Sequence, residues 1–195
     1  MIETLGSLDR KIFIAIHHDM ANDLCDVVFP LLREPLTWIP LYLFFGYMAV
    51  KKYKLEGFYV LLATGFVVLL CDQFSASIIK PLFERLRPCH EPTLTTHIRH
   101  LVNCGGQYGF ISSHATNHFG MAVLFTWFFK NISSKTWLNW IFYVWAALIC
   151  FAQVYVAKHY PGDVLAGMLF GILIGKLVLS IFTKIVMIKK ISSKL

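Results

Sequence analysis

Long apolar runs separated by short polar breaks dominate the chain. A helix needs roughly 20 apolar residues to cross about 30 Å of hydrocarbon, and five runs approach that length. The predicted spans are Leu36–Val50, Phe58–Ile79, Phe110–Phe129, Trp137–Val156 and Val164–Ile188. The pattern therefore predicts an all-α fold, an integral membrane bundle with five transmembrane helices.

The N-terminal part of the chain is too polar to cross a bilayer by itself. Within Leu8–Arg33, apolar residues are interrupted by His17-His18-Asp19 and by Asp26. This mixture is typical of short amphipathic helices at a membrane interface. We expect two such helices, and a sixth, poorly hydrophobic span is the alternative. The chain then divides into an interfacial segment, residues 1–35, and a membrane-embedded bundle, residues 36–190.

Composition supports a membrane protein. The 195 residues are 57% hydrophobic and only 15% charged, with a mean hydropathy of +0.62, whereas soluble domains carry about a quarter charged residues. This excludes an ordinary soluble domain and a disordered chain. The net charge of +7 comes largely from residues that flank apolar runs, which argues against a nucleic-acid partner and for the lipid bilayer.

Lysine placement orients the bundle, because positive residues accumulate on the cytoplasmic side. The lysines of three connecting or terminal segments share one side by alternation of the spans: Lys51, Lys52, Lys54, Lys130, Lys135, Lys184, Lys189, Lys190 and Lys194. We take that side as cytoplasmic. The outward side then carries Leu8–Arg33, a long loop at residues 80–109 and the turn His159–Gly162.

The cysteines fit this topology. Cys89 and Cys104 share the outward loop, where an oxidising compartment permits a disulfide; two free thiols are the alternative. Cys71 and Cys150 lie within predicted spans, and we expect them to be small buried residues of the core.

Three polar clusters lie at the outward ends of predicted spans, and each has an ordinary explanation when taken alone. Lys80 and Arg87, after the second span, are typical of an interfacial anchor. Ser112-Ser113-His114 opens the third span, where a serine caps a helix and free N–H groups favour a phosphate oxygen. His159 and Asp163 open the fifth span, where capping also accounts for them.

The clusters are more informative together, because the alternation of spans places all three on one face. A carboxylate that binds one ring nitrogen of a histidine fixes the tautomer and leaves the other nitrogen free to attack. Two cations, a helix N-terminus, a lone histidine and a His–Asp pair fit phosphoryl transfer, in which positioning and charge stabilisation supply most of the catalysis.

On these residues the chain resembles the type-2 phosphatidic acid phosphatases, membrane relatives of acid phosphatases and vanadium haloperoxidases. The family motif K-x6-RP is matched by Lys80, Arg87 and Pro88, and PSGH appears as Ile111-Ser112-Ser113-His114. The motif SR-x5-H-x3-D keeps His159 and Asp163. The resemblance covers roughly residues 58–175.

The resemblance implies a metal-independent lipid phosphatase without a cofactor. His159 would attack phosphorus and become a phosphohistidine, with Asp163 orienting it. His114 would protonate the leaving oxygen and later activate water, which gives a bell-shaped pH–rate profile. The phosphoryl oxygens would be held by Lys80, Arg87, Ser112 and the backbone near Ser113.

Besides Ile111 in place of proline and Ser113 in place of glycine, the chain departs from the family pattern in the third motif. Ala152-Gln153 stands where the family has Ser-Arg, and a neutral amide replaces a charged, forked donor. The phosphate contact of Gln153 should therefore be weaker. Lys158, beside the proposed nucleophile, or Arg99 in the outward loop is a candidate to compensate.

The expected substrate is a membrane lipid that carries a phosphate or diphosphate, in a bacterial inner membrane with the site facing the periplasm. Undecaprenyl diphosphate is slightly favoured over a lipid A phosphate, and phosphatidylglycerol phosphate is less favoured. The loop Cys89–Gly109, with His97, Arg99 and His100, is the expected selectivity element.

Two other classes stay open. The loop histidines His90, His97 and His100 would suit a metal-dependent hydrolase, although no HExxH or Cys-x-x-Cys spacing supports one. Asp72 and Lys176 would be the intramembrane charges of a transporter. We expect Asp72 to be a hydrogen-bonding residue of the bundle interior and Lys176 to snorkel toward the cytoplasm. A transporter should gather its polar groups near the midplane, whereas here they collect at one end.

Overall fold

The computed structural model describes residues 2–130 and 137–192, so that Lys135 and Lys194 lie outside it. Apart from an isolated bridge between Leu86 and Tyr108, the regular structure of these residues is helical. The helices are α1 (Ile2–Ile14), α2 (Asp23–Arg33), α3 (Ile39–Tyr53), α4 (Leu55–Gln73), α5 (Lys80–Phe83), α6 (Ser113–Lys130), α7 (Leu138–Tyr155) and α8 (Pro161–Ser192). The π-helical turns Ala15–Asp19 and Phe74–Ile79 extend α1 and join α4 to α5, and the 3₁₀ turns are Pro35–Trp38, Pro88–His90 and Pro92–His97.

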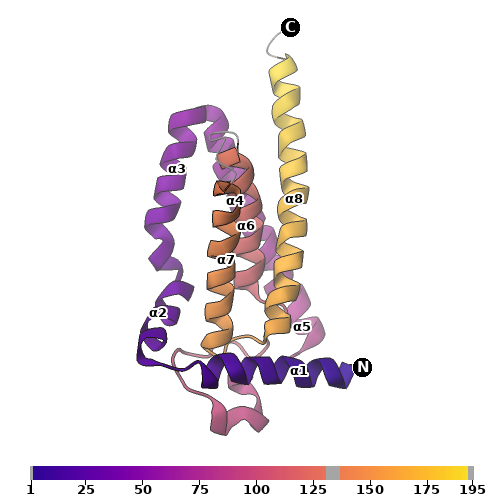
Figure 1. The fold of residues 1–195 in the computed structure, drawn as a ribbon. Coiled ribbons are helices and arrows are strands. Elements are labelled where there is room, and N and C mark those ends of the chain that lie inside the picture. The colour runs from indigo at the N-terminus through magenta and orange to yellow at the C-terminus, as the bar shows by residue number, and fades with distance from the viewer. Residues whose placement is uncertain (1, 131–136, 193–195) are drawn as a thin grey trace.

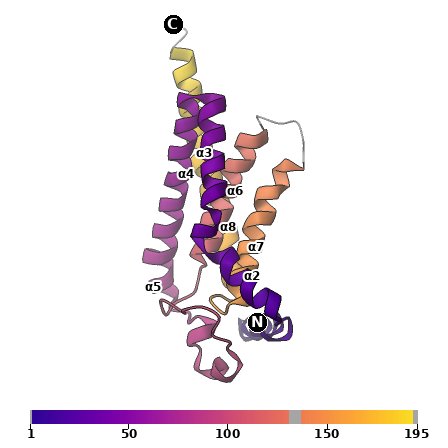
Figure 2. The same cartoon turned by 90° about the vertical axis from the view of Figure 1, so that its left-hand side faces the viewer.

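The helices form a bundle around α6, which packs against α4, α7 and α8. Figure 1 shows α3, α4, α6, α7 and α8 running roughly along one direction, with α1 lying across one end. In both views the loop between α5 and α6 lies at that same end (Figure 1, Figure 2). The starts of α6 and α8 and the end of α7 therefore meet where the outward loop and α1 cover the bundle.

Each predicted span contains a helix, but fewer helices qualify as spans by length and composition. Leu55–Phe83 and Pro161–Ile185 are long and apolar enough to cross a membrane. Asp23–Arg33 and Pro35–Tyr53 qualify only as a pair bent by 75°, and Trp140–Tyr155 is a shorter apolar helix. The first turns of α6 contain serine, histidine, threonine and asparagine, and these polar residues lower the mean hydropathy of the helix. They are tolerated there because α6 is the buried centre of the bundle.

A stripe of glycines brings the backbones of α6 and α8 into contact. A Cβ at Gly167 would lie 2.7 Å from the carbonyl oxygen of Ser112, and one at Gly171 would lie 2.3 Å from that of Thr116. Gly175 approaches Gly120 in the same way, at 2.8 Å. Small residues four apart permit such close helix packing in membranes, and here they fix the start of α6 against α8.

The two N-terminal helices predicted within Leu8–Arg33 are present as α1 and α2. Asn22 caps α2, because its Oδ1 accepts a hydrogen bond from the Cys25 amide at 2.9 Å. α2 packs along α7, whereas α1 crosses the end of the bundle (Figure 1). The two helices are present as predicted, and their position at a membrane interface stays a prediction.

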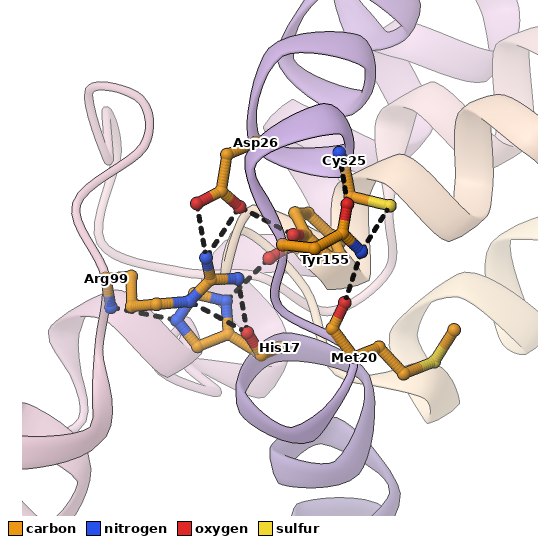
Figure 3. A network of polar contacts seen from close by, with 7 residues as sticks. His17, Met20, Cys25, Asp26, Arg99 and Tyr155 are labelled. Carbon is orange, nitrogen blue, oxygen red and sulfur yellow. Dashed lines mark hydrogen bonds and ion pairs between the residues drawn. The ribbon is translucent and has the colours of Figure 1, made fainter.

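A polar network joins these helices to the outward loop (Figure 3). The Arg99 guanidinium donates to both carboxylate oxygens of Asp26, at 2.6 and 2.8 Å, and Tyr155 donates to the same carboxylate at 2.5 Å. His17 Nδ1 donates to the Tyr155 carbonyl at 2.6 Å, and His17 Nε2 accepts from the Arg99 amide at 2.9 Å. His17 is therefore neutral, and burial lowers its pKa. Arg99, a candidate phosphate ligand from sequence, holds the loop to the helices here.

The intramembrane charges expected for a transporter lie on the outside of the bundle. Asp72 and Lys176 are both exposed. The prediction of Asp72 as a buried hydrogen-bonding residue is wrong, because the side of α4 that faces the core at this level is that of Cys71 and Ser75, both of which are fully buried. Cys150 is buried as well, so both cysteines of the predicted spans are core residues as expected.

Candidate active site

The three sequence clusters meet at one end of the bundle. His114 lies in the first turn of α6, His159 lies just before α8, and Lys80 begins α5. The Ser112 amide donates to the carbonyl oxygen of Asp163 at 3.0 Å, which joins the start of α6 to the start of α8. The alternation of helices that the sequence predicts thus produces a single polar region.

His159 and Asp163 form the most buried pair of this region. His159 is 3% exposed and Asp163 is fully buried, and Nδ1 of the imidazole lies 3.6 Å from Oδ2 of the carboxylate. Burial lowers the pKa of His159 to about 4, against the raising effect of Asp163. The imidazole is therefore neutral at physiological pH. Because Nδ1 faces Asp163, Nε2 is the nitrogen left to act as a nucleophile.

Arg85 and Asp9 hold Asp163 in place, and the sequence singled out neither of them. Arg85 donates to Asp163 Oδ1 at 2.6 Å and to Asp9 of α1 at 2.5 Å, and its guanidinium lies 4.4 Å from the centre of the Tyr160 ring. Asp9 also accepts from the Gly162 amide at 2.7 Å. Arg85 is a third basic residue within the K-x6-RP run, whereas no sequence pattern marked Asp9.

Lys80 and the serines form one wall of the site. The Lys80 ammonium donates to Ser113 Oγ, which also accepts from Ser75 at 2.8 Å. Ser112 is fully buried, and its Oγ accepts from the Ala115 amide at 3.4 Å, the contact expected of a helix cap. Lys80 and both serines are therefore grouped at the start of α6.

Arg87 and Gly109 form the wall that faces the outward loop. Arg87 donates through Nε to the Tyr108 carbonyl and through Nη1 to the Cys104 carbonyl, both at 3.1 Å. A Cβ at Gly109 would lie 3.1 Å from Asp163 Oδ2 and 3.5 Å from His159 Nδ1. Gly109 thus lets the loop approach the His–Asp pair closely, a role the sequence did not reveal.

His114 is supported by a second histidine. His118, one turn along α6, donates from Nδ1 to the His114 carbonyl at 2.7 Å, and the two rings stack with their centres 6.0 Å apart. Trp145 of α7 packs edge-on against His118 at 5.0 Å. These contacts hold the first turns of α6 in place, and the sequence had singled out only His114.

The two positions considered for weaker phosphate contacts differ in their surroundings. Gln153 is fully buried, and neither atom of its side-chain amide has a hydrogen-bond partner. Lys158 donates to the carbonyls of Asn103, at 2.7 Å, and Cys104. Burial, with the charges of Arg87 and Arg33, lowers the pKa of Lys158 to about 8. Lys158 thus also anchors the outward loop.

Cys89 and Cys104 form a disulfide, with their Cα atoms 6.1 Å apart. Across the described residues, the group of side chains suited to a metal ion is Cys89, His90 and Cys104. The disulfide engages both of its sulfurs, and His90 Nε2 lies 3.1 Å from the Gly105 carbonyl. The loop histidines His97 and His100 are outside that group.

Comparisons with known proteins agree with this arrangement. A model described as the PAP2 superfamily matches residues 56–187. The chain is 30% identical to a lipid A 4'-phosphatase of Porphyromonas gingivalis over 183 residues, which are 93% of this chain and 75% of that protein. It is also 30% identical to a lipid A 4'-phosphatase of Bacteroides thetaiotaomicron over 175 residues, covering 88% of this chain and 75% of that protein.

Two solved structures share the fold. A transmembrane PAP2 type phosphatidylglycerolphosphate phosphatase from Bacillus subtilis aligns with a TM-score of 0.71 and 24% identity, over 93% of this chain and 88% of that one. LpxE from Aquifex aeolicus aligns with a TM-score of 0.64 and 22% identity, over 89% of this chain and 95% of that one.

Proposed function

The chain belongs to the PAP2 superfamily and is a membrane lipid phosphatase, a hydrolase of phosphoester bonds, and from this premise we propose that its substrate is a lipid A phosphate. The two lipid A 4'-phosphatases that match most of the chain support this substrate over undecaprenyl diphosphate, which the sequence had slightly favoured. The observation that carries the chemistry is the buried His159 imidazole, whose Nδ1 lies 3.6 Å from the fully buried Asp163 carboxylate.

In the proposed reaction, His159 Nε2 attacks phosphorus and the bond to the lipid oxygen breaks. His114 gives its proton to that oxygen, so the lipid alcohol leaves and a phosphohistidine remains. His114 then takes a proton from water, whose oxygen attacks phosphorus and releases inorganic phosphate and neutral His159. Asp163 Oδ2, 3.6 Å from Nδ1, stabilises the positive charge that develops on the ring.

The phosphoryl oxygens are bound by the cations and donors around this pair. Lys80, Arg87, Ser112 and Ser113 are the principal proposed ligands, and Gln153 and Lys158 contribute more weakly. Donors placed before the reaction stabilise the charge that develops on phosphoryl oxygens without reorganising at that moment. The Ser75 hydroxyl on Ser113 and the Tyr108 and Cys104 carbonyls on Arg87 hold these ligands in position.

The membrane arrangement is also part of the proposal. We place α3, α4, α6, α7 and α8 across the bacterial inner membrane, with the lysine-bearing ends in the cytoplasm and the site at the periplasmic face. Residues 1–35 lie at the interface, with α1 across the outward end of the bundle. A lipid headgroup then reaches His159 from the bilayer surface.

Phosphate release by purified protein from three lipids tests the proposed substrate. We expect hydrolysis of lipid A to exceed that of undecaprenyl diphosphate and phosphatidylglycerol phosphate, with mass spectrometry showing the loss of one phosphate from lipid A. Activity should survive a chelator and be inhibited by vanadate. Loss of activity on chelation would favour the metal-dependent alternative, and preference for another lipid would reject lipid A.

Asp9→Asn should lower kcat by about tenfold with little change in KM, because it weakens a charge-assisted hydrogen bond to the guanidinium that holds Asp163. Asp9 contacts Arg85 and the Gly162 amide and lies outside the phosphate-binding groups, so substrate binding should be spared. Steady-state kinetics on lipid A measure both constants. Asp19→Asn, in an acid with a 66% exposed side chain, is the matched control; equal kinetics of the two variants would refute a positioning role for Asp9.

A further inference from the structure

The disulfide of the outward loop lies next to the phosphate site. Cys89 follows Arg87 by two residues, and its amide donates to the carbonyl of Ala157 at 3.2 Å, shortly before His159 in the chain. Cys104 belongs to the later part of the loop, and its Cα lies 6.1 Å from that of Cys89. The bond therefore ties the later part of the loop to the two segments that carry Arg87 and His159.

The main-chain carbonyl of Cys104 accepts hydrogen bonds from two of the proposed phosphate ligands. Arg87 donates to it through Nη1 at 3.1 Å, and Lys158 donates to it through Nζ. Lys158 also donates to the neighbouring carbonyl of Asn103 at 2.7 Å. One short piece of backbone thus receives both cations, and its position helps to set where their remaining N–H donors point.

Arg87 depends on this carbonyl for its orientation. A guanidinium is a rigid, planar fork of five N–H donors, and here Nε donates to the Tyr108 carbonyl and Nη1 to the Cys104 carbonyl, both at 3.1 Å. Two bonds from different nitrogens of one plane fix the direction of the whole fork. A Cβ at Gly109 would lie 3.2 Å from Arg87 Cγ and 3.1 Å from Asp163 Oδ2, so the fork is fixed beside the catalytic pair.

The hydrogen bonds around the Cys104 end of the loop lie at the surface. Residues 98–107 form neither helix nor strand, and residues 105–107 are exposed. The Gly105 amide donates to Asn103 Oδ1 at 2.9 Å, and the Gly105 carbonyl lies 3.1 Å from Nε2 of the exposed His90. Exposed hydrogen bonds open easily and hold a backbone loosely, whereas a covalent cross-link restrains the chain directly. The disulfide is therefore the firm attachment of this stretch.

We propose that the Cys89–Cys104 disulfide is a positioning element of the phosphate site, which holds the Cys104 carbonyl where it orients Arg87 and Lys158 toward the substrate phosphate. The proposal rests on the proposed phosphatase function. It makes full activity depend on the oxidised loop, as suits an enzyme whose site faces an oxidising compartment. When a dithiol supplies two electrons and two protons, the S–S bond becomes two thiols, the carbonyl is released and both cations lose their fixed direction.

The first test is the full-length Cys89→Ser/Cys104→Ser double variant, assayed without reductant. Its kcat/KM on lipid A should fall by about tenfold, because Arg87 keeps the Tyr108 carbonyl but loses the second contact that aligns a charged hydrogen bond. Orthovanadate binding, measured by calorimetry, should weaken to a similar degree. In an Arg87→Gln background most of this effect should disappear, since the disulfide acts mainly through Arg87. Fully additive effects in that cycle would overturn the proposal.

Reduction tests the same bond in the wild-type protein. Dithiothreitol should lower kcat/KM to the level of the double variant, reoxidation should restore it, and the double variant should not respond. Mass spectrometry after alkylation verifies that the bond has opened. Cys25→Ser is the matched control, because Cys25 is a free, half-buried cysteine of α2; its kinetics and its response to dithiothreitol should equal those of the wild type.

Melting temperatures separate positioning from folding. If the double variant and the reduced wild type lose activity only in proportion to their folded fraction, and the folded protein keeps its orthovanadate affinity, the disulfide is merely structural and the proposal fails. Equal kinetics and equal affinity of wild type and double variant would also overturn it and leave the phosphatase function standing. If the wild type releases phosphate from none of the lipids, the proposed function fails, and the orthovanadate affinities of wild type and double variant alone decide on the disulfide.

Discussion

His159→Ala is expected to reduce phosphate release by about 10⁴-fold or more, because removing the nucleophile of a covalent mechanism leaves only binding and charge stabilisation. The imidazole is 3% exposed and lies against a fully buried carboxylate. Because the position is enclosed, we expect no other nucleophile to replace the imidazole in the variant. The rate should be measured on lipid A with variant and wild type at equal folded concentration. Rapid quenching with labelled substrate should trap a phosphohistidine in the wild type and none in the variant.

The pH–rate profile of the wild-type enzyme gives a second test of His159. Burial lowers the pKa of His159 to about 4, so the neutral, attacking form persists as the pH falls and is lost only near that value. In the free enzyme, the acid limb contributed by this histidine should therefore lie well below the ordinary histidine pKa of about 6.5. His18→Ala, at a side chain that is 57% exposed, should leave rate and profile unchanged. Substantial turnover by His159→Ala would assign the nucleophile to another group.

His114→Asn should lower turnover of lipid A by about 10²- to 10⁴-fold, the usual contribution of a general acid and base. The loss should be smaller for the first step with an activated aryl phosphate, because its leaving group needs no proton. Hydrolysis of the phosphohistidine still requires a base, so an aryl phosphate should give a burst of phenol equal to the enzyme concentration, followed by slow turnover. Stopped-flow absorbance measures both phases.

The matched control for His114 is its neighbour on the same helix. His118 stacks on His114 and donates to the His114 carbonyl, so His118→Asn should change stability more than the leaving-group dependence. If His114→Asn slows lipid and aryl phosphate equally and shows no burst, His114 positions the substrate and does not transfer the proton. That result would redirect the search for the general acid toward the other groups near His159.

The order of the polar clusters along the chain determined much of the site in advance. Lys80, His114 and His159 each follow or open an apolar run, and alternating passes of a helical bundle return such ends to one face. Helix positions were predictable for the same reason, because apolar runs of this length favour helices whose backbone groups are satisfied internally. The number of spans was less accessible, since α6 carries its polar residues inside the bundle and loses the hydropathy that marks a span.

What the linear chain could not determine were contacts between segments without a shared pattern. Asp9 binds Arg85 across 76 residues of sequence, and this contact links α1 to the group that holds Asp163. Arg99 binds His17 across 82 residues, so Arg99 is occupied by a structural contact. The sequence shows that a residue is cationic, but only the packing of the helices decides whether that cation contacts a carboxylate, a carbonyl or the substrate.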